Sequence, residues 1–183
     1  GEGIPFNDPL NENQWGLVNT GDKSIAKTAR EGADVGVKDA WALTAGTPDV
    51  VVAVCDAPVK YTHPDLADNM WVNEAEKNGA AGVDDDGNGY VDDIHGYNFY
   101  SDGPIKWDAE GESGHGTHVA GIIAAVNGNG IGVSSIAGGS GNGDGVRLMS
   151  CQLFEGYNAG ADREMAEAFI YAADNGACIA QCS

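Results

Sequence analysis

Basic residues are scarce in this chain of 183 residues, which has 9 Lys and Arg against 28 Asp and Glu. The formal net charge of −19 repels phosphate backbones and anionic lipid surfaces. The sequence also lacks an apolar run of about 18 residues, and its first residues have neither the basic nor the apolar region of a signal peptide. We therefore expect a soluble chain with no nucleic-acid partner and no membrane insertion.

Cysteine is infrequent as well, with four residues at positions 55, 151, 178 and 182. Each lies in an apolar segment that we predict to be a strand, so buried and reduced thiols are the expected state. On one extended strand Cys178 and Cys182 would be roughly 13 Å apart, which is too far for a disulfide. The cysteine count therefore does not identify the redox compartment.

The order of apolar segments predicts an α/β domain with a mainly parallel sheet. We expect helices over residues 37–44, from about 115 to 126 and over 162–175, and strands over 49–55, 146–154 and 177–182. Residues 1–33 are polar and rich in Gly, Asn and Asp, which favours an irregular N-terminal arm, while 34–183 form the α/β core of the same domain. A parallel strand at the end of the sequence predicts a sheet that is incomplete at the C-terminus.

Two residues at element boundaries are candidate catalytic groups. Asp56 follows the first predicted strand, where sites form in open α/β sheets, although a turn-capping role is as well supported by this residue alone. His115 begins an apolar helix between two glycines, and the positive end of the helix dipole there favours a neutral base at about pH 7. A zinc pair with His118 is a weaker alternative, because the glutamate of an H-E-x-x-H helix is absent and the histidine spacing differs.

Three segments in chain order resemble the subtilisin-like serine peptidases, or subtilases. They are Val-Ala-Val-Cys-Asp at 52–56, His-Pro-Asp-Leu at 63–66 and His-Gly-Thr-His-Val-Ala-Gly at 115–121. The resemblance implies a subtilisin-like three-layer fold and a serine endopeptidase that cleaves peptide or protein substrates. It also implies that Asp56 orients the imidazole of His115, which acts as the base, and that the protein is secreted or held in the cell envelope.

The resemblance covers the N-terminal part of a catalytic domain. The segments that carry the family's nucleophilic serine and oxyanion-hole asparagine are not found, so we expect the fragment alone to be inactive and to be completed by the downstream remainder of its own domain. Ala57 and Pro58 replace the hydroxyl residue and glycine that usually follow the aspartate, which removes two hydrogen-bond donors. The alternative function is therefore a catalytically degenerate subtilase that serves as a calcium-binding or interaction module.

An acidic, glycine-rich segment predicts a structural Ca²⁺ loop. Asp84, Asp86 and Asn88 occupy positions 1, 3 and 5 of a calcium-loop pattern, Tyr90 offers its carbonyl at position 7, and Asp92 stands at position 9. The pattern is incomplete because position 12 is not a glutamate, and the alternative is an exposed acidic turn. The family resemblance alone implies a second calcium site at Gln14, Asp65 and Asn129, with Asn127 as the alternative to Asn129.

Overall fold

The computed structural model describes residues 3–108 and 113–183. The chain divides into two compact units, one made of Gly1–Pro48, Pro64–Asn69 and Gly121–Val146, and the other of Asp49–His63, Met70–Ala120 and Arg147–Ser183. Within the described residues, no helix has both the length and the apolar character needed to cross a membrane.

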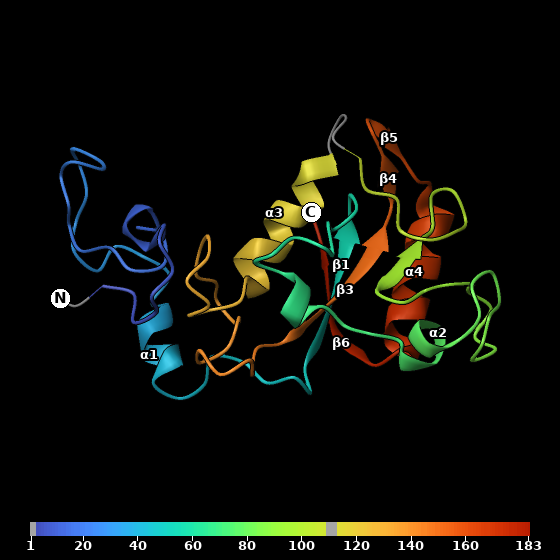
Figure 1. Ribbon diagram of the computed structural model, residues 1–183. Coiled ribbons are helices and arrows are strands. Elements are labelled where there is room, and N and C mark those ends of the chain that lie inside the picture. Colours follow the sequence, from blue (N-terminus) through green and yellow to red (C-terminus); the bar gives the residue numbers. More distant parts are fainter. Residues whose placement is uncertain (1–2, 109–112) are drawn as a thin grey trace. The chain divides into compact units, whose positions relative to one another are not determined.

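The second unit is built on a parallel sheet with the strand order β2-β3-β1-β6 (Figure 1). The strands are β1 (Val51–Asp56), β2 (Gly96–Asn98), β3 (Arg147–Gln152) and β6 (Ala177–Cys182), and a small hairpin joins β4 (Phe154–Glu155) to β5 (Asn158–Ala159). All six residues of β1 are buried, as expected for a valine-rich strand at the centre of a parallel sheet. The predicted α/β class and parallel sheet are confirmed.

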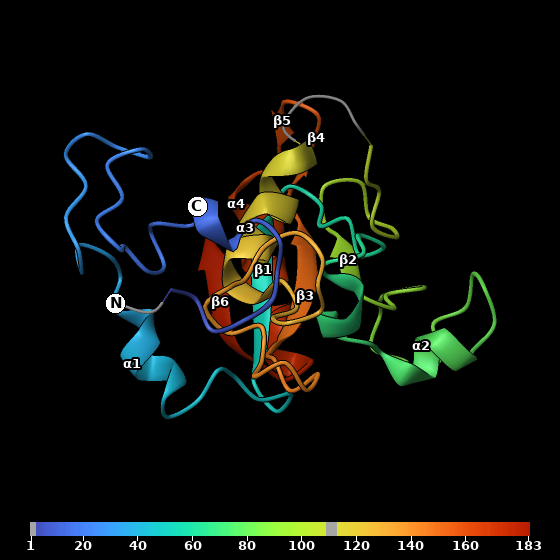
Figure 2. The same cartoon turned by 60° about the vertical axis from the view of Figure 1, so that its left-hand side comes forward.

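One face of this sheet packs against α4 (Asp162–Asp174). The core there contains Cys55 from β1, Cys151 from β3 and Tyr171 from α4, all at most 1% exposed. Tyr90, Tyr97, Phe99 and Tyr171 add edge-to-face aromatic contacts, with ring centroids between 4.8 and 5.7 Å apart. Figures 1 and 2 show the first residues of α3 (Ser113–Ala124), which belong to this unit, on the side of the sheet opposite to α4. The helix α2 (Glu74–Asn78) precedes the acidic segment and is N-capped by the side chain of Asn73.

The prediction of four buried thiols is wrong for two of them. Cys55 and Cys151 are buried, whereas Cys178 and Cys182 are exposed. The physical reason is the place of β6, which lies at one edge of the sheet and has mostly exposed residues.

The first unit contains little regular structure. Its elements are the 3₁₀ helices η1 (Asn11–Asn13) and η2 (Ala67–Asn69), the short helix α1 (Val37–Trp41) and the last residues of α3 (Ser113–Ala124), whose first residues belong to the second unit. Hydrogen bonds from side chains hold this unit, for example from Trp41 Nε1 to the carbonyl of Ile136 at 2.9 Å. The helix predicted over residues 37–44 is present as α1, but it ends earlier, at Trp41.

Candidate active site and metal site

The side chains of Asp56 and His115 meet at the carboxyl end of β1. Asp56 is the last residue of that strand and is 1% exposed, while His115 is the third residue of α3. His115 Nδ1 lies 2.6 Å from Asp56 Oδ1, which confirms the predicted hydrogen bond between the two side chains. A carboxylate that accepts from Nδ1–H selects the tautomer with the lone pair on Nε2. The pair can therefore present a neutral imidazole as a proton acceptor.

The turn after Asp56 fits closely under the start of α3. A Cβ atom on Gly116 would lie 1.9 Å from the carbonyl oxygen of Ala57, so only glycine allows this approach. Thr117 Oγ1 accepts the backbone N–H of Lys60 at 2.9 Å. Glycine and threonine after the histidine thus bring the two catalytic candidates together.

The Ala57-Pro58 sequence does not leave the carboxylate of Asp56 without a backbone donor. The N–H of Ala57 donates to Asp56 Oδ1 at 2.6 Å. On the other side of the carboxylate, Ser183 Oγ lies 3.5 Å from Oδ2. Ala57 thus gives the carboxylate a backbone hydrogen bond, although it lacks the side-chain hydroxyl that usually follows the aspartate.

Three carboxylates gather beside α2. Single oxygen atoms of Glu76, Asp86 and Asp93 all lie within 4.8 Å of one another. Glu76 and Asp93 are 4% and 0% exposed, whereas Asp86 is exposed. Burial raises the pKa of Asp93. Like charges this close favour either a proton or a shared cation, and oxygen donors of this kind suit hard divalent ions. This carboxylate cluster could hold a metal ion.

The cluster is positioned by the cap of α2 and by α4. Asn73 Nδ2 donates to Asp86 at 2.8 Å and to Asp93 at 3.0 Å. The hydroxyl of Tyr171 donates to Asp93 Oδ2 at 2.6 Å. Glu76 accepts the backbone N–H groups of Asp85 and Asp92 at 2.6 and 2.9 Å, so it also shapes the loop.

The structure places the other predicted ligands of this loop differently. Asp84 accepts the N–H groups of Gly87 and Gly89 at 2.8 Å each, and such backbone bonds, led by that of Gly89, lower its pKa. Asn88 Oδ1 accepts the N–H of Tyr90 at 2.8 Å, and Asp92 accepts that of Gly82. Asp86 is thus the predicted carboxylate that joins the cluster, while the side-chain amide of Asn88 donates to Asp93 Oδ2 at 3.0 Å and to Asp86 Oδ2 at 3.3 Å.

Sequence reasoning missed Glu76, Asp93 and Asn73. Two signals were available. Asn73 begins a short helix whose third residue is Glu76, an arrangement that points an acidic side chain back toward the helix start. Asp93 stands between a second aspartate and the apolar Ile94, at the transition from loop to core.

Comparison with known proteins decides the family. The model of the Subtilase family matches residues 47–183. This chain belongs to the subtilase family. Subtilisin-like protease 1 of Plasmodium vivax is 35% identical over 171 residues, which are 93% of this chain and 24% of that protein. The halolysin-like extracellular serine protease Nep of Natrialba magadii is 31% identical over 145 residues, covering 79% of this chain and 22% of that protein.

Solved structures agree with this subtilase assignment. The Aeromonas sobria serine protease, determined in complex with its chaperone, matches with a TM-score of 0.61 and 26% identity over 93% of this chain and 23% of that chain. The chain thus spans about a quarter or less of the length of these relatives. The expected family and fold are confirmed, over part of a longer fold.

The second predicted calcium region of this subtilase lies in the first unit. Asp65 is 2% exposed, and its two oxygens accept from Asn129 Nδ2 at 2.9 Å and from the N–H of Val133 at 3.0 Å. Gln14 forms two bonds of 2.8 Å with the backbone of Ser134. Asp65 and Asn129 are therefore brought together, while Gln14 binds the neighbouring backbone.

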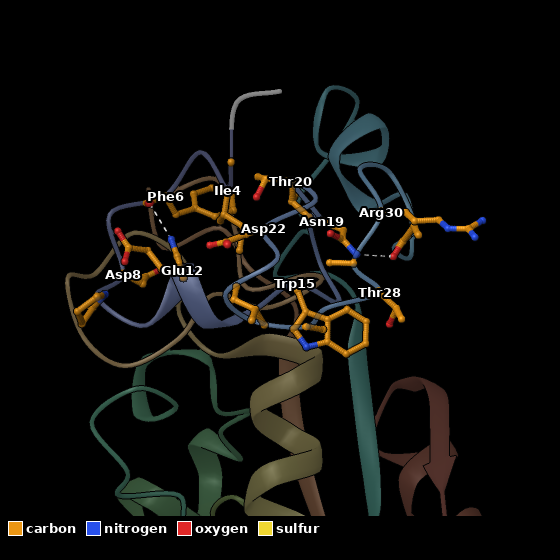
Figure 3. A pocket seen from close by; sticks show the side chains of 18 of the residues that line it. Ile4, Phe6, Asp8, Glu12, Trp15, Asn19, Thr20, Asp22, Thr28 and Arg30 are labelled. Atoms are coloured by element: carbon orange, nitrogen blue, oxygen red, sulfur yellow. Dashed lines mark hydrogen bonds between the residues drawn. The ribbon is translucent and has the colours of Figure 1, made fainter.

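A cavity of about 860 Å³ lies in the N-terminal arm (Figure 3). Apolar side chains such as Ile4 and Trp15 line it beside the acidic Asp8, Glu12 and Asp22. Neither member of the Asp56–His115 pair and no member of the carboxylate cluster lines this cavity. Cavity size therefore does not indicate where the chemistry occurs in this chain.

Proposed function

We propose that this chain is the N-terminal part, with residues 1–33 as an irregular arm, of a subtilisin-type serine endopeptidase domain. Asp56 and His115 supply two members of its Asp-His-Ser triad, and the nucleophilic serine comes from the downstream remainder of the domain. The observation that carries this proposal is the 2.6 Å contact between His115 Nδ1 and Asp56 Oδ1 at the end of a buried parallel strand.

The chemistry follows from that contact. Asp56 holds the imidazole in the tautomer whose Nε2 accepts the serine proton, and it stabilises the imidazolium that forms. The serine oxygen then attacks the peptide carbonyl, and His115 returns the proton to the leaving amine. An acyl-enzyme forms and is hydrolysed by water through the same proton transfers in the opposite direction.

We further propose that the carboxylate cluster binds Ca²⁺ as a structural ion. Its donors are carboxylate oxygens, which calcium prefers. Glu76 belongs to α2, and Asp93 is held by a hydrogen bond from Tyr171 of α4. Asp84, Asn88, Tyr90 and Asp92 order the loop around that ion, and Gln14, Asp65 and Asn129 are the alternative calcium region if the cluster binds none. The acidic charge and the extracellular relative Nep support a secreted or cell-envelope location.

The test is peptidase activity of the complete protein with Asp56→Asn or His115→Ala. The kcat is expected to fall about 10⁴-fold or more in either variant, a magnitude taken over from enzymes with the same triad. His118→Ala is the matched control, because His118 is an exposed residue of the same helix, and it should retain activity. The isolated chain should show no turnover.

Two outcomes would contradict this assignment. If the wild-type complete protein hydrolyses no peptide while still binding calcium, the degenerate calcium-binding module is the correct function. If the two variants keep wild-type kcat, Asp56 and His115 do not form the catalytic pair.

A further inference from the structure

Three cysteines stand side by side across the parallel sheet. Cys55 on β1 is in register with Cys151 on β3 and with Cys182 on β6. Side chains in register on neighbouring parallel strands project from the same face, so the three sulfur atoms form a row with Cys55 in the middle. Neither the peptidase chemistry nor the carboxylate cluster uses this row.

Two cysteines of the row, Cys55 and Cys151, are buried side by side. Cys55 and Cys151 are 1% and 0% exposed and belong to the core beneath α4. Both are reduced, and the S–H of Cys151 forms a hydrogen bond with the sulfur of Cys55, which lowers the pKa of Cys55. The two thiols are thus in direct contact inside the core.

Strand spacing favours a bridging ion over a disulfide between these thiols. Neighbouring strands are about 4.8 Å apart, and Cβ atoms in register keep that separation, whereas a disulfide needs about 3.5 to 4.5 Å between them. An ion midway between two sulfurs, with metal–sulfur bonds of about 2.3 Å, needs sulfurs about 4.6 Å apart. The thiols are now in hydrogen-bonding contact, and rotation of the two side chains about their Cα–Cβ bonds can set this sulfur separation without moving the strands.

We propose that Cys55 and Cys151 form a binding site for a soft, thiophilic metal ion held between two sulfur ligands. Thiolates select soft ions of this class over hard ions such as calcium. On binding, both thiols release their protons to solvent, two metal–sulfur bonds form, and no group is oxidised or reduced. A divalent ion neutralises the two thiolates, which suits a site inside an apolar core.

The test uses mercuric chloride as the probe on the fully reduced protein, with the reductant removed under nitrogen. Wild type is expected to retain one Hg²⁺ at this site through gel filtration, with an ultraviolet sulfur-to-mercury absorption band and an unchanged near-ultraviolet circular dichroism spectrum. Cys55→Ala and Cys151→Ala should each lose that ion and at least 100-fold in affinity. Cys178→Ala, a cysteine of β6 outside the row, should bind as wild type does.

Alanine should be tolerated at these positions, because each substitution removes a single sulfur atom and leaves only a small cavity. Cys55→Val fills the core with a residue of similar size and should lose the ion equally. Unchanged Hg²⁺ retention in both the Cys55 and Cys151 variants would overturn the proposal, as would binding that requires loss of the near-ultraviolet spectrum. The measurement needs no peptidase activity, so its failure leaves the catalytic proposal standing.

Discussion

The two acid-rich regions of this subtilase satisfy their carboxylates in opposite ways. In the carboxylate cluster, Glu76, Asp86 and Asp93 lie within 4.8 Å of one another, so each adds to the negative potential at the others. In the region of Asp65, the buried carboxylates of Asp65 and Asp8 accept from neutral donors, for example from the amide of Asn129 and from the backbone N–H groups of Val133 and Gly128. The first region gains from a cation, whereas the second is already stabilised by neutral donors. An acidic composition alone does not distinguish the two.

The largest expected effect is the loss of calcium stabilisation when a cluster carboxylate is neutralised. With calcium at about 100 times its Kd, the free energy of unfolding should rise by about 2.7 kcal/mol in wild type. Asp86→Asn should lose most of this increase, because it removes one ligand charge from an exposed position of the cluster. Thermal unfolding with calcium and with a chelator measures the difference.

Matched variants sharpen the comparison between the regions. Asp85→Asn removes the same charge from the same loop, but Asp85 is outside the cluster and accepts the N–H of Ala80. Asp85→Asn and Asp65→Asn should both keep the calcium increase. If Asp86→Asn keeps the full calcium-dependent increase in stability, the ion does not bind at the carboxylate cluster. If Asp65→Asn loses that increase, the ion binds in the region of Asp65.

An intermediate effect is expected from pH. Burial raises the folded-state pKa of Asp93 above its unfolded value, so without calcium the folded protein binds more protons than the unfolded chain between these two pKa values. Its stability should fall as the pH rises through that window. Calcium needs the ionised carboxylate, so its affinity should fall by up to about tenfold per pH unit as the pH drops below the raised pKa.

Calorimetric titration of calcium at several pH values measures this dependence. Asp93→Asn removes the titrating group and should give a weaker affinity that depends less on pH. An affinity in wild type that does not change as the pH is lowered would indicate that Asp93 is not a ligand.

The smallest expected effect concerns Asn129. Asn129→Ala removes the amide donor to a buried oxygen of Asp65 and should lower the free energy of unfolding by about 1 to 2 kcal/mol. The loss should be equal with calcium and with chelator. Urea unfolding measures it, with the exposed Asn142→Ala expected to stay within about 0.5 kcal/mol of wild type. A loss seen only with calcium would assign an ion to the Asp65 region.

The sequence was sufficient for the features that depend on local order. The buried run of β1 and the helix around His115 follow from neighbouring residues, whereas the contact between Asp56 and His115, which are 59 residues apart, was predicted from these two positions together with the resemblance to subtilases. The geometry of the acidic loop could not be predicted in this way, because the direction of each carboxylate depends on which backbone N–H groups the folded loop presents. The pairing of Cys55 with Cys151 depends on register between distant strands, which no local pattern encodes.

The central place of β1 has a consequence for how this fold forms. Its two neighbours, β3 and β6, arrive about 100 and about 125 residues later in the chain, so the sheet is built almost entirely from non-local pairings, which fold slowly. During synthesis at about 5 to 20 residues per second, the apolar strand β1 waits for several seconds with both edges unpaired. The sequence that makes the best-buried strand of the finished sheet is therefore the segment most exposed to aggregation before the sheet closes.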